Sequence, residues 1–209
     1  LRDEYGARTL IVQDDHFMGD AARALQIVQL IGELGLRMVF QNGLAMYALK
    51  HEFLEALKEA GVENLLLSIE SGSENTLRKI MKKPLKLHLV SKVVQDCRDL
   101  GIYTNANIII GMPGETPEDI DEGARFLKTI NPNWFMIFCA SPLVGSEMYD
   151  IAASKGYLKE GYIGSDYKRA VIETEDFSAD YIQERSYALN LDLNFVNNTD
   201  MQLGEYATA

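Results

Sequence analysis

Short apolar runs alternate with longer segments in which apolar residues recur every three or four positions, and the alternation repeats about five times. The short runs have the length and residue types of strands, and the longer segments have the spacing of helices. Because strand and helix alternate throughout, the pattern predicts an α/β fold with a parallel sheet covered by helices. The predicted strands are Thr9–Gln13, Arg37–Gln41, Asn64–Ile69, Tyr103–Ile110 and Asn133–Ala140.

Glycines and capping residues mark where the predicted helices end and begin. Gly35, Gly61 and Gly101 each follow the last apolar position of a helical segment, where a left-handed cap is favoured. Thr116 can cap a fourth helix, with Pro117 suited to its first turn. The first three helical faces comprise Ala24, Ile27, Ile31 and Leu34, then Phe53, Leu57 and Ala60, then Val90, Val93, Cys97 and Leu100.

The regular alternation stops after Gly156. No low-complexity linker divides the chain, so we expect one domain: a core over residues 1–158 and a C-terminal extension over residues 159–209. This extension reads as a turn-rich segment Tyr157–Asp166, a weak strand Lys168–Glu173, a last helix Ser178–Phe195 and a fraying polar tail Asn197–Ala209.

Composition excludes several classes of protein. The 209 residues are 47% hydrophobic and carry a net charge of −11, which would repel nucleic-acid phosphates. The longest apolar run, Trp134–Ala140, has seven residues, whereas a membrane-spanning helix needs about 20. The first residues form no signal peptide, and two cysteines make no disulfide framework. We therefore expect a cytoplasmic protein with neither nucleic acid nor membrane as its partner.

Polar residues follow every predicted strand, at the ends where parallel α/β folds carry their chemistry. Hydroxyls, amides and three carboxylate positions dominate, and these motifs hold no Lys or Arg, so the set suits a ligand with hydroxyl and ammonium groups rather than bare phosphates. Each motif alone is also explained as a cap or a turn. The set comprises Asp14–Asp15, Gln41–Asn42–Gly43, Ser68–Glu70–Ser71, Asn105, Asn107, Gly111–Glu115 and Ser141.

Other catalytic patterns are missing or poorly placed. The sequence contains no P-loop and no G-x-G-x-x-G after a strand, and Glu115 would repel a phosphate from the Gly111–Glu115 segment. The three histidines lie in no nucleophile elbow, which makes surface positions the simpler interpretation. Cys97 and Cys139 fall on apolar faces, and we expect both to pack in the core rather than bind metal.

The ordered motifs resemble those of radical S-adenosylmethionine (SAM) enzymes, particularly the cobalamin-associated branch. Leu10–Phe17 (L-I-V-Q-D-D-H-F) is similar to the second strand and following loop of that family, and the likeness extends over about residues 9–158. Val144 departs from the usual proline of the last motif. The other matching segments are Gln41–Leu44, Phe53–Gly61, Leu67–Ser73 with Leu77 and Lys83, Ile110–Thr116 and Ser141–Ser146.

The resemblance implies a fold, a cofactor and a set of binding residues. The fold would be a partial parallel (β/α)₆ barrel of TIM type, which decides between a barrel and an open sheet. SAM would be the bound cofactor. Its ammonium would lie near Asp14 and Asp15, its carboxylate or ribose near Ser68 and Glu70 with help from Gln41 or Asn42, and its adenine and ribose near Asn107 and Gly111. For Glu70 a structural salt bridge is the alternative.

The family's C-x-x-x-C-x-x-C motif, which binds a [4Fe-4S] cluster, is missing from these 209 residues. By the resemblance, the first strand and the cluster loop would belong to a longer parent enzyme, so this chain alone should be inactive. The parent would need an external electron donor and would bind cobalamin only through a separate domain; its catalytic residues and substrate stay unknown. Alternatives are a non-catalytic scaffold module, and a cofactor-free barrel hydrolase or aldolase that would need a Lys or metal site.

Two further expectations concern surfaces. Without a preceding strand, Thr9–Gln13 would be an exposed edge through which chains could self-associate. The extension tyrosines Tyr157, Tyr162 and Tyr167 could line a substrate entrance or pack a lid against the core.

Overall fold

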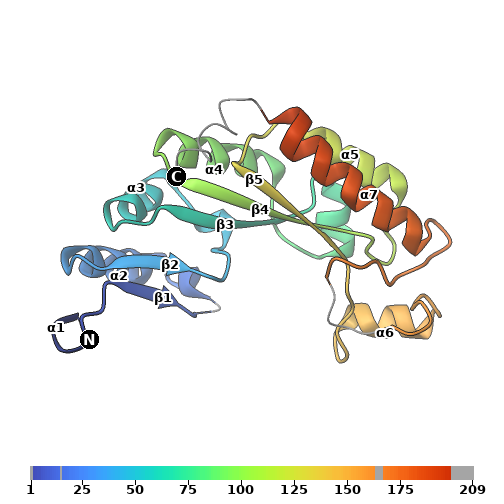
Figure 1. Cartoon of the computed structure of the whole chain (residues 1–209), viewed down its shortest axis with the longest axis horizontal. Helices are drawn as coiled ribbons and strands as arrows, with labels where there is room; N and C mark the ends of the chain where they lie inside the picture. The colour runs from blue at the N-terminus through green and yellow to red at the C-terminus, as the bar shows by residue number, and fades with distance from the viewer. Residues whose placement is uncertain (1, 15, 163–166, 199–209) are drawn as a thin grey trace. The chain divides into compact units, whose positions relative to one another are not determined.

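The computed structural model describes residues 2–14, 16–162 and 167–198 (Figure 1). All five predicted strands are present, with bounds that agree within one residue at each end. They are β1 (Thr9–Val12), β2 (Arg37–Phe40), β3 (Asn64–Glu70), β4 (Tyr103–Ile110) and β5 (Trp134–Cys139).

Helices occupy the intervals between strands, as the periodicity predicts. Gly35, Gly61 and Gly101 follow three of them with φ of 66°, 76° and 63°, which confirms the left-handed caps. Among the described residues, no helix is long and apolar enough to cross a bilayer. The α-helices are α1 (Arg2–Tyr5), α2 (Ala21–Glu33), α3 (His51–Glu59), α4 (Leu87–Asp99), α5 (Pro117–Leu127), α6 (Glu147–Ser154) and α7 (Ala179–Leu191). Shorter turns are the 3₁₀ helices η1 (Phe17–Gly19) and η2 (Met46–Ala48) and the π-helices η3 (Thr76–Ile80) and η4 (Asp192–Asn197).

The strands form two partial sheets rather than a closed barrel within the described part of the chain. In one sheet β1 pairs with β2 in parallel, in register from Thr9 with Arg37 to Val12 with Phe40. The other has the order β3-β4-β5. The chain divides into two compact units, one of Leu1–Ile69, Leu87–Ala106 and Pro132–Trp134, the other of Glu70–Lys86, Asn107–Asn131 and Phe135–Ala209.

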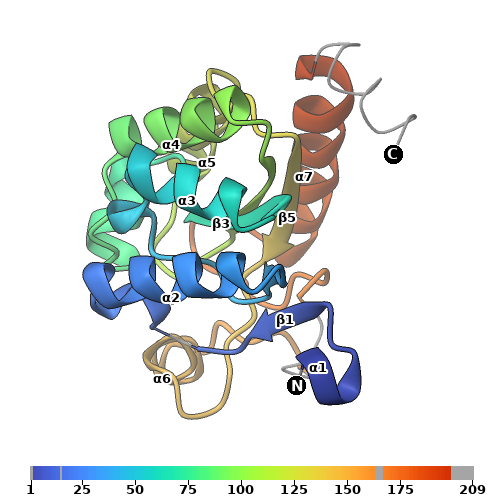
Figure 2. The same ribbon diagram turned by 90° about the vertical axis from the view of Figure 1, so that its left-hand side faces the viewer.

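In the first unit, α3 contacts α2 on one side and α4 on the other (Figure 2). Leu54, Leu57 and Val62 are fully buried there. The predicted face of α2 is only partly right, because Leu34 is 48% exposed while Val28 is completely covered. A sheet of two short strands offers too little surface to cover the whole length of α2.

In the second unit, an ion pair between Arg185 and Asp121 joins α7 to α5. Thr116 caps α5 as predicted: its Oγ1 accepts a hydrogen bond from the backbone N–H of Asp119 in a capping box. After α7, the buried Asn194 bonds both backbone groups of Phe135, with N–O distances of 2.8 and 2.9 Å. The end of the extension therefore holds β5 in place.

The predicted weak strand Lys168–Glu173 is wrong. This segment forms only an isolated antiparallel bridge, between Ile172 and Leu158. Two backbone hydrogen bonds frame this bridge: Val171 O accepts from Lys159 N, and Glu173 N donates to Tyr157 O. A single bridge does not make a ladder. The last helical stretch continues to Asn197, two residues beyond the predicted end; residues 163–166 and 199–209 lie outside the described residues.

Candidate functional site

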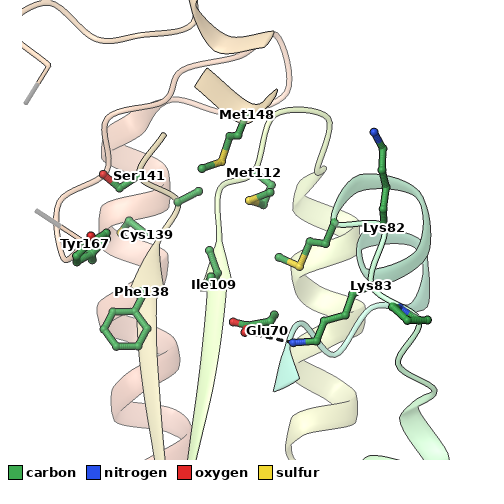
Figure 3. Close-up of a pocket in the computed structure, with 13 residues that line it drawn as sticks. Glu70, Lys82, Lys83, Ile109, Met112, Phe138, Cys139, Ser141, Met148 and Tyr167 are labelled. Atoms are coloured by element: carbon green, nitrogen blue, oxygen red, sulfur yellow. Dashed lines mark hydrogen bonds and ion pairs between the residues drawn. The ribbon is translucent and has the colours of Figure 1, made fainter. Parts of the chain in front are cut away.

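A cavity of about 750 Å³ lies in the second unit, where β3, β4 and β5 end (Figure 3). Residues at the carboxyl ends of all three strands line it, as expected for the functional edge of a parallel α/β sheet. A volume of this size is typical of a small-molecule site. The lining residues are Glu70, Met81, Lys82, Lys83, Pro84, Ile109, Met112, Phe138, Cys139, Ala140, Ser141, Met148 and Tyr167.

Glu70, a predicted site residue, ends β3 and lines the cavity. Its backbone has φ of 71°, a left-handed conformation that costs a non-glycine residue about 1–2 kcal/mol. The carboxylate is 21% exposed, and its Oε1 lies 3.3 Å from Lys83 Nζ. Strain of this kind persists where surrounding structure enforces it, and it concentrates at ligand sites. The salt bridge expected as the alternative role is present, and the carboxylate still reaches the cavity.

The loop after β3 packs directly against α5. A Cβ atom on Gly72 would lie 2.4 Å from the backbone oxygen of Gly123, so only glycine allows this approach. Beside it, Asp119 Oδ1 accepts hydrogen bonds from Ser73 Oγ at 3.3 Å and from Asn75 Nδ2 at 2.9 Å. These contacts explain the Ser-Gly-Ser sequence that follows Glu70, because they fix the backbone that carries it.

Glu115 anchors the loop after β4 from inside the protein. It is 1% exposed, and its Oε2 accepts from Gly111 N at 2.7 Å and Met112 N at 3.2 Å. Thr76 Oγ1 donates to its other oxygen at 3.2 Å. Burial raises the pKa of this carboxyl to about 7, against the three hydrogen bonds, which lower it. Glu115 therefore shapes the loop that carries Met112 into the cavity, instead of facing a ligand as the sequence interpretation assumed.

Four predicted site residues belong to the first unit. Asp14 Oδ1 accepts from His16 N at 2.8 Å after β1, and Gln41 Oε1 accepts from Gln13 Nε2 at 2.6 Å. Asn42 precedes Gly43, where a Cβ atom would lie 2.4 Å from Ser68 Oγ. The close approach of Gly43 to Ser68 thus brings Ser68 near Gln41 and Asn42 within one unit. Asp15 lies outside the described residues.

Two predicted residues lie on or just after β4, near the cavity but not in its wall. Asn107 Oδ1 is buried and has no hydrogen-bond partner among the described residues. Gly111 has φ of 83°, and a Cβ atom there would lie 2.8 Å from Ile182 of α7. The cavity wall is formed instead by neighbours of these two residues, Ile109 and Met112.

Several cavity residues are absent from the predicted site. Lys82 and Lys83 line it, although the strand-end motifs themselves contain no Lys or Arg. Both lysines follow the motif of the third strand in sequence, and it is the tertiary structure that brings them close to the strand ends. Tyr167, one of the three extension tyrosines for which a substrate entrance and a lid were both expected as roles, lines the cavity. Three methionines, Met81, Met112 and Met148, add a polarisable apolar lining.

The described residues fit SAM better than they fit a metal cluster. No group of three or more His, Cys, Asp or Glu among them could hold a metal ion. Cys97 and Cys139 are both buried as predicted, and burial raises the pKa of the Cys97 thiol to about 12, which disfavours a metal-binding thiolate. The carboxylate of Glu70, which lines the cavity, can accept hydrogen bonds from hydroxyl and amino groups such as those of an adenosyl ligand.

Comparisons with known proteins establish the family of the chain. The family model of the Radical SAM superfamily matches residues 3–127. Cytidylyl-2-hydroxyethylphosphonate methyltransferase of Streptomyces wedmorensis is 30% identical over 203 residues, which are 93% of this chain and 38% of that protein. An uncharacterized methyltransferase of Pyrococcus horikoshii is 25% identical over 158 residues, 76% of this chain and 34% of the relative. The chain thus spans little more than a third of these relatives.

Solved structures show the same fold. Coproporphyrinogen III oxidase of Escherichia coli, a radical SAM enzyme, superposes with a TM-score of 0.58 at 14% identity, covering 85% of this chain and 37% of that one. The radical SAM methyltransferase TsrM of Kitasatospora setae, solved with cobalamin and a [4Fe-4S] cluster bound, gives 0.61 at 19% identity, covering 74% and 30%. The partial barrel is therefore of the radical SAM type, and the chain belongs to the Radical SAM superfamily.

Proposed function

We propose that this chain supplies the SAM-binding core of a radical SAM enzyme. The observation that carries the proposal is the placement of Glu70 at the end of β3. Its backbone is held in a left-handed conformation, and its partly buried carboxylate lines a cavity at the carboxyl ends of three strands. A carboxylate there can accept hydrogen bonds from two ribose hydroxyls. When bound and reduced by one electron, SAM supplies methionine and a 5′-deoxyadenosyl radical that abstracts hydrogen from a substrate.

The other predicted residues take the roles that the family resemblance implies. Ser68, with Gln41 or Asn42, would share the carboxylate and ribose with Glu70, while Asp14 and Asp15 would face the ammonium. Asn107 and the backbone at Gly111 would border the adenine. Support comes from the Asn107 Oδ1 atom, which is buried without a partner among the described residues and would accept from an amino group.

The cluster, the electron donor and any cobalamin belong in this proposal to the complete protein. The 209 residues contain no C-x-x-x-C-x-x-C, and neither cysteine is exposed. Two relatives are named as methyltransferases, which favours methyl transfer as the reaction, with cobalamin held by a separate domain. The alternative of a non-catalytic scaffold has no support from relatives that are named as enzymes. We place the protein in the cytoplasm, where thiolate ligands of a cluster stay reduced.

Anaerobic reconstitution with iron and sulfide tests the proposal. We expect the complete protein to gain the absorbance of a [4Fe-4S] cluster and, with dithionite, to convert SAM to 5′-deoxyadenosine, measured by chromatography. The 209-residue chain should gain neither property, because it lacks the three clustered cysteines. A cluster and SAM cleavage in the chain alone would contradict the division of roles, and a complete protein that does not bind SAM would contradict the function.

Self-association through β1 is a separate proposal about this chain. Ile11 is 54% exposed on a strand that pairs with β2 alone among the described residues. Exposed strand edges recruit other chains, and a charge on the edge prevents this. We expect light scattering of the 209-residue chain to show dimers or larger species at high concentration, and Ile11→Lys to restore the monomer. A monomeric wild-type chain at the same concentration would rule out the edge as an association site.

A further inference from the structure

The cavity has one charged wall and one apolar wall. Glu70, Lys82 and Lys83 are its charged lining residues, and all three belong to the second unit. Figure 3 shows Phe138, Cys139 and Tyr167 on the opposite side, with Met112 and Met148 between the two walls. Lys83 points toward Glu70 in this view, whereas Lys82 extends away from that pair. A ligand that fills this cavity therefore meets apolar surface on one side and a second lysine on the other.

Lys82 is held in an unfavourable backbone conformation. Its φ is 53°, and Glu70 and Lys82 are the two non-glycine residues with positive φ in the described part of the chain. Both line the same cavity. A left-handed position would accept glycine or asparagine more readily than lysine, so a lysine here is opposed by about 1–2 kcal/mol of backbone energy. Strain at two residues of one cavity points to a role in ligand binding.

The Lys82 ammonium pairs with Glu147 at the start of α6. The neighbours of both residues, Met81 and Met148, line the cavity, so the ion pair lies at its edge. The two side chains are 65% and 68% exposed. An exposed ion pair of this kind contributes at most about 1 kcal/mol, because water screens it. Glu147 can therefore be replaced as the partner of Lys82 by a ligand group of greater negative charge.

The charge of the surrounding segment supports such a ligand. The chain has a net charge of −11, yet residues 78–86 contain five basic side chains and no acidic one. Two of these five, Lys82 and Lys83, line the cavity, and basic groups beside a cavity raise the local concentration of anions. Lysine binds phosphate groups as a point charge and needs no special geometry.

We propose that Lys82 is a specificity residue for an anionic substrate: it binds a phosphate or phosphonate group attached to an apolar or planar body, and Glu147 is its partner only until that substrate arrives. The planar or apolar body would contact Met112, Met148 and Phe138. This inference rests on the proposed function, because it assigns the substrate class of the same cavity. In this assignment Glu70 and Lys83 belong to the part of the site that binds SAM, here called the SAM side.

Two opposite substitutions test the role of Lys82. Cytidine 5′-monophosphate and cytidine serve as probes, because they differ only in the phosphate, and calorimetry of the complete protein measures both affinities. We expect the wild type to bind the monophosphate more tightly than cytidine. Lys82→Met should lower the affinity for the monophosphate about fivefold, and Glu147→Gln should raise it about twofold, since each substitution changes one surface ion pair whose energy is at most about 1 kcal/mol. Cytidine should bind equally to all three proteins.

The signs of these changes separate recognition from structure. Both variants break the same ion pair, so a purely structural pair would shift the affinities in the same direction, and that result would overturn the proposal. Equal binding of both probes by the wild type would also overturn it. S-adenosylhomocysteine binding should change less than twofold in either variant; if Lys82→Met weakens it, Lys82 belongs to the SAM side instead. Failure of the wild type to bind S-adenosylhomocysteine would contradict the proposed function and leave the Lys82 test intact.

Discussion

Wild-type protein is expected to lose about 3 kcal/mol of stability relative to the Glu115→Gln variant as the pH rises from 4.5 to 8. The folded state raises the pKa of Glu115 from 4.5 to about 7, mainly by burial. Between these two values the native protein holds a proton that the unfolded chain has released, so the contribution of this group is favourable at low pH and is lost as pH rises through 7. A shift of about 2.5 units corresponds to about 3 kcal/mol.

Urea unfolding of both proteins at pH 4.5, 6 and 8 measures this difference. Groups other than Glu115 titrate alike in the two proteins. Their contributions therefore cancel when the free energy of unfolding of one protein is subtracted from that of the other. Glutamine keeps an acceptor for the N–H groups of Gly111 and Met112, so the variant is expected to fold. Glu118→Gln, a change at the exposed start of α5, is the matched control and should follow the wild type. Parallel curves for wild type and Glu115→Gln would show that folding does not raise the pKa of this carboxyl.

Replacing Glu70 with glutamine should weaken binding of S-adenosylhomocysteine to the complete protein by about tenfold. The carboxylate lines the cavity and would lose its charge toward the ribose hydroxyls, and hydrogen bonds to a charged group contribute about 1.5–3 kcal/mol. Calorimetry checks the affinity. The exposed Glu63, just before β3, provides the control: Glu63→Gln should bind as the wild type does. Unchanged affinity in Glu70→Gln would remove Glu70 from the SAM site.

Glycine and alanine at position 70 separate strain from binding. Both variants lack the carboxylate, so both should bind S-adenosylhomocysteine more weakly than the wild type does. Since φ is 71° here, glycine should be more stable than alanine by about 1 kcal/mol, measured by urea unfolding. If alanine proves as stable as glycine, the backbone of residue 70 is not held in the left-handed conformation.

The local patterns of the sequence predicted the strands and helix ends well, because these depend on neighbouring residues. All five strands were placed within one residue, and Thr116 caps α5 as its surroundings indicated. Burial depends on what lies opposite an element, and there the pattern was less reliable. Leu34 continues the apolar face of α2 in sequence but is 48% exposed at the end of the helix.

The sequence likewise predicted Glu70 as a site residue, because its motif ends a strand where ligands bind, and the structure places Glu70 in the cavity wall. It could not identify Lys82, which is separated from that strand end by a π-helix, and for Tyr167, almost a hundred residues away, it left a lid role open beside a place in a substrate entrance. Nor could it tell that Glu115 faces inward, since a Glu after a Gly-Met-Pro-Gly turn has the same local pattern whether it is exposed or buried.

The sequence by itself determined the α/β alternation, the family and the residues at the strand ends, because hydrophobic period, capping and motif order are local properties of the chain. Only the tertiary structure decided which side chains share a cavity, which carboxylate is strained and which is buried. Those properties arise when segments far apart in sequence pack together and exclude water, and their energies depend on distances that no local pattern contains.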